Sequence, residues 1–203
     1  MNRTIAATAL SLLLAATAFA QNQGATTGSS TAGSPRNTKS DATSLSAQDQ
    51  KFVREAAAGG MMEVMLGKVA VQKASSQDVK DFGQRMVDDH SKANQQLSSL
   101  ASQKGLTLPT ALPANMQKDM DKLSALSGAE FDRMYMGHMV KDHKKDVAEF
   151  EKEASKAADS SLKSFAQQTL PTLREHLTMA QTIAPKVGAN MAAADHGDHS
   201  GKH

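Results

Sequence analysis

A long amphipathic segment occupies residues 76–104 and reads SQDVKDFGQRMVDDHSKANQQLSSLASQK. Its apolar residues recur every three or four positions, the spacing that places side chains on one face of an α-helix. Ser75 and Asp78 favour a helix start, and Gly105 favours a stop. His90 lies at the centre of the apolar face, which also carries Val79, Phe82, Gly83, Met86, Ala93, Leu97 and Leu100. The segment therefore predicts a helix that turns a histidine toward the protein core.

Three other segments repeat this pattern, each with one polar residue near the middle of an apolar stripe. The segments and their polar residues are 46–74 with Glu63, 128–157 with His143, and 160–183 with His176. A buried carboxylate or imidazole is costly unless it has a partner. Four such groups at the midpoints of four helices therefore predict that they meet at one level of the core.

Two of these helices contain residues that are unfavourable inside a helix. Gly59, Gly60 and Gly67 each lower helix propensity by roughly 1 kcal/mol. We expect the close approach of a neighbouring helix beside Glu63 to compensate for them. Pro171 lies inside the fourth long helix and predicts a kink just before His176, because proline removes one backbone hydrogen bond.

The connection between the second and third long helices, residues 106–127, differs from the other connections. Pro109 and Pro113 bound a loop, and Pro113 suits the first position of a short helix. Antiparallel neighbours in a bundle are usually joined by roughly 2–8 residues, so this longer connection predicts a crossover along the bundle. Ser127 and Glu130 then predict a capping box at the start of the third long helix.

Two long helices, a long connection with a short extra helix, and two more long helices are the connectivity of ferritin-like bundles. We therefore predict an all-α, ferritin-like four-helix bundle over residues 46–184. Residues 21–45 are rich in Ser, Thr, Gly, Asn and Ala and predict a disordered linker. Residues 185–203 are small and polar and predict a disordered tail that contains histidines.

Residues 1–20 have the pattern of a secretory signal peptide. Arg3 precedes an apolar run, and residues 18–20 read AFA, which fits a signal-peptidase site. The apolar run is shorter than the ~20 residues that a membrane span needs. We therefore expect cleavage before Gln21, no transmembrane segment in the mature chain, and a periplasmic or secreted protein.

The chain resembles a bacterial exported family known as domain of unknown function 4142. The similarity covers residues 46–183 and includes the motifs MVDDH at residues 86–90 and LREH at residues 173–176. This resemblance implies a ferritin-like fold and an exported location. It implies no established activity.

Composition excludes several classes of protein. The formal net charge is +2, and basic residues alternate with acidic ones along the helices, which argues against a nucleic-acid surface. Cysteine is absent, which excludes disulfides, Cys-ligated zinc and iron–sulfur clusters. No phosphate-binding loop, nucleophile elbow or HExxH motif is present. If the protein is an enzyme, which the sequence does not favour, we expect a metal-dependent oxidoreductase.

One carboxylate and three imidazoles suit a single divalent ion, and Zn, Fe, Mn and Cu all accept such ligands. A ferritin-type di-iron centre needs Glu-x-x-His on two helices, but Val87 and Leu173 occupy those glutamate positions. Asp89 and Asp146 are placed to orient imidazoles, whereas His138 falls off the apolar stripe. We predict a mononuclear metal site whose ligands are Glu63, His90, His143 and His176.

Two other interpretations fit the same residues. The four groups could form a metal-free hydrogen-bond network that fixes helix register, in an interaction module that binds an unidentified envelope protein. Methionines near the proposed site could favour copper, but Met also fills irregular gaps in helical cores. These methionines are Met61, Met62, Met65, Met86, Met134, Met136 and Met139. For the metal-binding protein, the exported location favours a role in metal handling or envelope stress.

Overall fold

The computed structural model describes residues 44–189, and this part of the chain is mostly helical. Its elements are α1 (Ala47–Lys73), α2 (Gln77–Gln103), α3 (Ala114–Ser124), α4 (Gly128–Lys156), α5 (Ser160–Ile183) and the 3₁₀ helix η1 (Ala184–Val187). The predicted signal peptide, nearly all of the predicted linker, and the tail from residue 190 lie outside the described residues. Within residues 44–189, no helix has the length and apolar character needed to cross a membrane.

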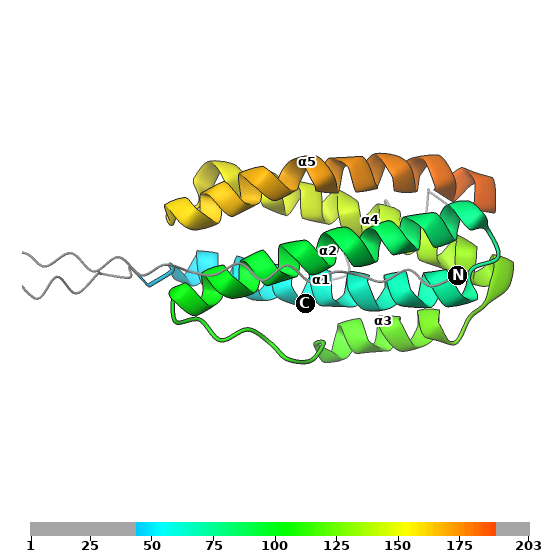
Figure 1. Cartoon of the computed structure of the whole chain (residues 1–203), viewed down its shortest axis with the longest axis horizontal. Helices are drawn as coiled ribbons and strands as arrows, with labels where there is room; N and C mark the ends of the chain where they lie inside the picture. Colours follow the sequence, from blue (N-terminus) through cyan, green and yellow to red (C-terminus); the bar gives the residue numbers. More distant parts are fainter. Residues whose placement is uncertain (1–43, 190–203) are drawn as a thin grey trace, which may run out of the picture. The chain divides into compact units, whose positions relative to one another are not determined.

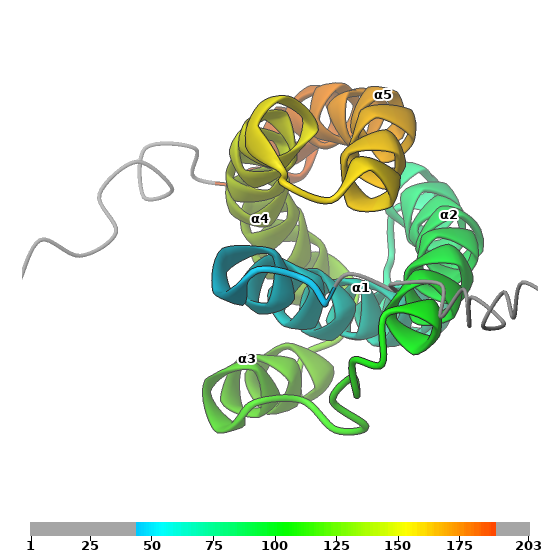
Figure 2. The same ribbon diagram turned by 90° about the vertical axis from the view of Figure 1, so that its left-hand side faces the viewer.

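Four long helices surround one core, and the short helix α3 lies outside them (Figures 1 and 2). The main neighbours are α1 with α2 and α4 with α5, and the ring closes through α2 with α5 and α1 with α4. The connection that contains α3 leads from one end of the bundle to the other, where α4 begins (Figure 1). The predicted ferritin-like four-helix bundle with a long second-to-third connection is therefore confirmed.

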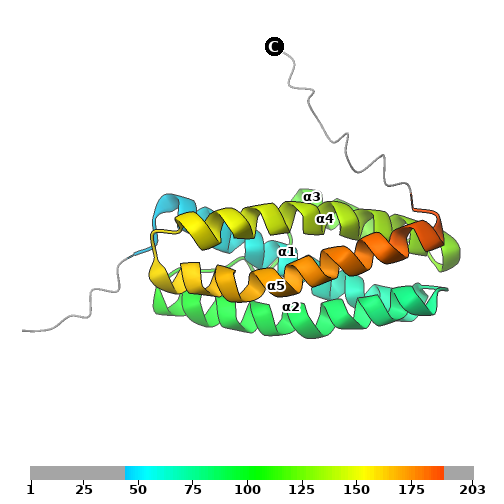
Figure 3. The same ribbon diagram turned by 90° about the horizontal axis from the view of Figure 1, so that it is seen from above.

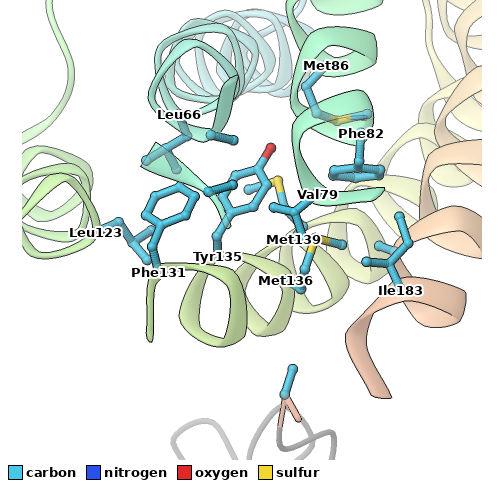
Figure 4. Close-up of a cluster of buried hydrophobic side chains, with 14 of the residues drawn as sticks. Leu66, Val79, Phe82, Met86, Leu123, Phe131, Tyr135, Met136, Met139 and Ile183 are labelled. Atoms are coloured by element: carbon cyan, nitrogen blue, oxygen red, sulfur yellow. The ribbon is translucent and has the colours of Figure 1, made fainter. Parts of the chain in front are cut away.

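The core consists of two apolar clusters that meet at the level of the buried polar residues. The first cluster includes Leu66, Phe82, Met86, Phe131, Tyr135 and Met139 (Figure 4). The second includes Phe52, Val53, Leu97, Phe150, Leu162 and Phe165. Along each long helix, one part of the apolar stripe belongs to the first cluster and the other part to the second. The polar residue of each helix lies at the junction.

Close packing of α1 against α2 explains two glycines but not a third. A Cβ on Gly67 would lie only 2.6 Å from the carbonyl oxygen of Gly83 on α2. A Cβ on Gly60 would overlap the side-chain amide of Asn94. A Cβ on Gly59 would meet nothing within 4 Å. The expectation of a close helix approach is therefore wrong for Gly59, which borders open space.

Local sequence predicts two helix caps that the structure lacks, and a tertiary contact replaces one of them. Ser127 is the N-cap of α4, but its side chain makes no capping hydrogen bond, so the predicted capping box is wrong. The N-cap of α2 is Ser76 rather than Ser75, and it also lacks a side-chain cap. Instead, Asp132 of α4 accepts hydrogen bonds from the backbone N–H groups of Ser75 (3.1 Å) and Ser76 (2.9 Å). A buried carboxylate from another helix thus caps α2.

Two proline residues also show how the helices are bounded and shaped. Pro113 is the N-cap of α3, whereas the sequence predicted it as the first residue of the helix. Pro171 lies inside α5 without interrupting it, and α5 bends along its length (Figure 3). Beyond α5, η1 continues the helical structure past residue 184, where the predicted bundle ends.

Replacing Asp132 with Ala should lower the free energy of unfolding by about 2–3 kcal/mol, since it leaves two N–H groups at the α2 terminus without their charged acceptor. Urea denaturation followed by circular dichroism measures this change. Asp119→Ala, on the exposed surface of α3, is the matched control and should change stability by less than about 0.5 kcal/mol. An equal decrease in the free energy of unfolding in the two variants would show that the Asp132 cap does not stabilise the protein.

Candidate metal centre

The structure brings Glu63, His90, His143 and His176 together, one from each long helix. Glu63 is 2% exposed and His90 6%, and the other two side chains are fully buried. The centroids of the three imidazole rings are 5.7 Å apart for His90–His143, 5.3 Å for His90–His176 and 5.4 Å for His143–His176. The three rings therefore form a compact triangle.

Each imidazole has one ring nitrogen held by an oxygen atom of the protein. The three contacts are His90 Nδ1 to Glu63 Oε2 at 2.9 Å, His143 Nδ1 to the Met139 carbonyl at 3.0 Å, and His176 Nε2 to Asp89 Oδ2 at 3.0 Å. A ring N–H donates to a carboxylate or carbonyl oxygen, so each contact fixes the tautomer of its ring. The other nitrogen of each ring then carries a lone pair.

These other nitrogens form a set of buried donor atoms. His90 Nε2, His143 Nε2 and His176 Nδ1 are buried and have no hydrogen-bond partner among residues 44–189. One nitrogen from each ring lies within 4.8 Å of one from each of the others. Buried acceptors without a partner are costly. A divalent ion bound to three imidazoles would satisfy all three, so the residues present fit a metal.

Glu63 lies beside the triangle and contacts two of its rings. Its Oε2 accepts the hydrogen bond from His90, while its Oε1 lies 3.4 Å from His143 Nε2. Oε1 is buried and has no hydrogen-bond partner within the described part of the chain. Two donor sets therefore fit the geometry: three imidazoles oriented in part by Glu63, or three imidazoles with Glu63 Oε1 as a fourth ligand.

Asp89 orients a ring on another helix. Asp89 contacts an imidazole, as the sequence predicts. The imidazole is that of His176 on α5, and not that of its sequence neighbour His90. Arg85 contacts Asp89 and also reaches Glu175 of α5 at 3.3 Å. Burial raises the pKa of Asp89, but hydrogen bonds from His176 and Arg85 outweigh burial and lower it. Asp89 therefore stays ionised and keeps its hold on His176.

The protonation of the site favours metal binding near neutral pH. Burial lowers the pKa of His143 and lowers that of His176 to about 4, so both rings are neutral. Burial also lowers the pKa of His90, but the adjacent Glu63 carboxylate outweighs it and raises the pKa overall. Burial raises the pKa of Glu63, and the three histidines reverse this and lower it. A metal ion would thus compete with a proton mainly at His90.

Apolar side chains close one side of the triangle. The Phe82 ring centroid lies 6.3 Å from that of His143 and 6.5 Å from that of His176. Met86 and Met139 are fully buried in the same cluster, one turn before His90 and His143 (Figure 4). Most of the methionines near this level therefore fill the core, and Met134 is 56% exposed.

His138 lies outside this set, as its position off the stripe predicts. Its Nε2 is 3.3 Å from Asp142 on the same helix, and its side chain is 21% exposed. It is therefore partly covered, although it is not in the group of nitrogens that could share a metal. The other three histidines of the chain lie outside the described residues.

Sequence reasoning missed a second buried polar pair, Asp49 of α1 and Glu153 of α4. Each residue is 2% exposed. Burial raises the pKa of Glu153 to about 7, and the charge of Asp49 and a hydrogen bond to it add to the shift. Asp49 continues the apolar stripe of Phe52, and Glu153 that of Phe150, each three residues away. Extending the periodicity to the helix ends would have found both.

The stability of the bundle should depend on the protonation of Glu153. The folded protein holds this proton up to about pH 7, whereas the unfolded chain releases it near the ordinary pKa of 4.5. Stability from this group is therefore present at low pH and is lost as pH rises through about 7. Glu153→Gln should stabilise the protein relative to the parent by on the order of 2 kcal/mol at about pH 8, with little difference at about pH 4.

Urea unfolding of both proteins across this pH range checks the prediction. Glu151→Gln is the control, because that side chain is half-exposed and paired with Arg174. A difference between Glu153→Gln and the parent that does not change with pH would contradict it.

Comparisons with known proteins support the fold. A family model described as "Domain of unknown function (DUF4142)" matches residues 34–183. The structure is similar to a crystal structure of a DUF305 fragment from Deinococcus radiodurans, with a TM-score of 0.62 and 13% identity, covering 70% of this chain and 99% of that one. A comparison with curated protein sequences found no match.

A crystal structure of a DUF305 protein from Streptomyces coelicolor gives a similar result. Its TM-score is 0.60 at 14% identity, and the alignment covers 74% of this chain and 97% of that one. At this level of identity, the two neighbours establish a shared helical-bundle fold and nothing about ligands or activity.

Proposed function

This chain belongs to the DUF4142 family, and we propose that it is an exported ferritin-like bundle protein that binds one divalent transition-metal ion in its core. The ligands are His90, His143 and His176, with Glu63 either completing the coordination or orienting His90. The observation that carries this proposal is that three buried imidazoles lie close together and that each has one ring nitrogen without a protein partner among the described residues.

A metal-free network fits these contacts less well. The protein oxygens already take one N–H from each ring, so each ring has a second, buried nitrogen with a lone pair and no protein donor among the described residues. One proton on His90 Nε2 could bridge only one further nitrogen and would leave the third unsatisfied. A metal ion accepts all three lone pairs at once. Carboxylate–histidine–metal arrangements of this kind recur in metalloproteins.

The donor set also indicates which ions are suitable. Imidazole suits Zn, Cu and Fe, and affinity for divalent ions at such sites generally rises from Mn through Fe to Cu and is lower for Zn than for Cu. Calcium is disfavoured because it takes mostly oxygen ligands. The absence of cysteine removes thiolate competition from the chain itself.

Export is supported by the sequence of residues 1–20, which has a basic start, an apolar run and a small-residue cleavage site. A periplasmic or secreted protein with one buried metal site suits a role in metal handling or in envelope stress. We propose binding rather than catalysis as the primary activity, because no catalytic motif accompanies the site.

Calorimetric titration with Zn²⁺ tests the site. The protein should carry serine in place of three tail histidines, His196, His199 and His203, so that only core sites are measured. This parent should bind one ion per chain. His143→Gln should lower the affinity by at least about 100-fold, and Asp89→Asn by about 10- to 100-fold through the orientation of His176.

His138→Gln is the matched control and should bind Zn²⁺ like the parent, because His138 is outside the triangle. Circular dichroism confirms that each variant is folded. A folded parent that takes up no Zn²⁺, Cu²⁺ or Fe²⁺ would contradict the proposal. It would favour instead the buried Glu–His network in a metal-free interaction module.

A further inference from the structure

A small cavity lies beside the histidine triangle, on the side away from Phe82. Its volume is about 30 Å³, and residues from all four long helices line it. Its polar lining includes Glu63, His90, Asp146 and Thr169. The rest of the lining is mostly apolar and includes Leu97, Phe150, Phe165 and Leu173. A space of this size accommodates roughly two water-sized molecules, and the few polar groups can hydrogen-bond to them. The site therefore has a packed side at Phe82 and a small space on the other side.

The absence of a side chain at Gly59 helps to keep this cavity empty. Gly59 lines the cavity, and a Cβ built on it would meet nothing within 4 Å. A glycine inside a helix costs roughly 1 kcal/mol relative to alanine. Close helix packing explains Gly67 but does not explain Gly59. A larger side chain at position 59 would enter unoccupied space beside Glu63, one turn away on the same helix.

Asp146 supplies a hydrogen-bonding group to the same cavity. It lies on α4, one turn beyond His143, and it lines the cavity together with Glu63. Burial raises its pKa well above the ordinary value, and the negative charge of Glu63 raises it further. A protonated carboxyl group can donate a hydrogen bond to a ligand in the cavity.

We propose that this cavity binds a small exogenous ligand of the metal ion, a diatomic or triatomic species of the azide or peroxide class. Where Glu63 orients His90 instead of binding the ion, the three imidazoles leave a coordination position free. Phe82, Met86 and Met139 belong to the apolar cluster on the opposite side of the triangle, whereas Glu63 and His90 line the cavity, so we place the free position on the cavity side. The ligand coordinates the metal there and accepts a hydrogen bond from Asp146. This inference rests on the proposed metal site.

Azide titration of the Co²⁺-loaded protein tests the inference, because the visible spectrum of Co²⁺ changes when its coordination changes. The same chain with serine at the three tail histidine positions is used, and bound Co²⁺ is measured separately. Azide should change the spectrum of the parent. Gly59→Leu should keep the Co²⁺ content and lower the azide affinity by at least about tenfold, because the leucine fills the cavity.

Gly137→Leu is the matched control. Gly137 also lies inside a helix beside open space, but it does not line this cavity. The azide affinity of Gly137→Leu should equal that of the parent. Asp146→Ala removes the hydrogen-bond donor and should weaken azide binding by a smaller factor without changing Co²⁺ content.

Two results would overturn the inference and leave metal binding intact. One is a Co²⁺-loaded parent whose spectrum does not respond to azide. The other is equal azide affinity in Gly59→Leu and the parent. A parent that takes up no Co²⁺ and no other divalent ion would overturn both this inference and the proposed function.

Discussion

The site depends on three hydrogen bonds, one made by each imidazole of the triangle. Glu63, the Met139 carbonyl and Asp89 each hold one ring nitrogen. These contacts fix the tautomers and leave each ring with one buried nitrogen that has no protein partner in the described part of the chain. Without them, the rings would be free to change tautomer and pair with one another. With them, the core contains a preorganised set of nitrogen donors, which is the property that a metal site requires.

Packing on both sides of the triangle along the bundle axis holds the three imidazoles in place. Two apolar clusters meet at the level of the triangle, so the polar groups are enclosed by packed side chains along the bundle axis. Asp132 joins α4 to the start of α2 and fixes the relative position of helices that carry two of the histidines. The cavity lined by Gly59 lies next to the site, among residues of the second apolar cluster. We propose it as the side from which a small ligand reaches the metal.

Periodicity predicted the four central residues because a polar side chain inside an apolar stripe must point into the core that the four helices share. The partners of these residues depend on features that a single helix does not encode. Asp89 and His90 are adjacent in sequence, so they point about 100° apart on the helix, and Asp89 therefore reaches His176 on α5. Likewise, the cap of α2 comes from Asp132, more than fifty residues away. Local signals at Ser75 and Ser127 could not indicate that.

X-ray absorption spectroscopy of the Zn²⁺-loaded protein without its tail histidines tests the central claim most directly, because it counts the imidazoles bound to the ion. Three imidazole nitrogens at about 2.0–2.1 Å, with one or two additional light atoms, are expected from the triangle of His90, His143 and His176. A shell made only of oxygen atoms, or one with a single imidazole, would contradict it. The buried histidines would then have a purely structural role.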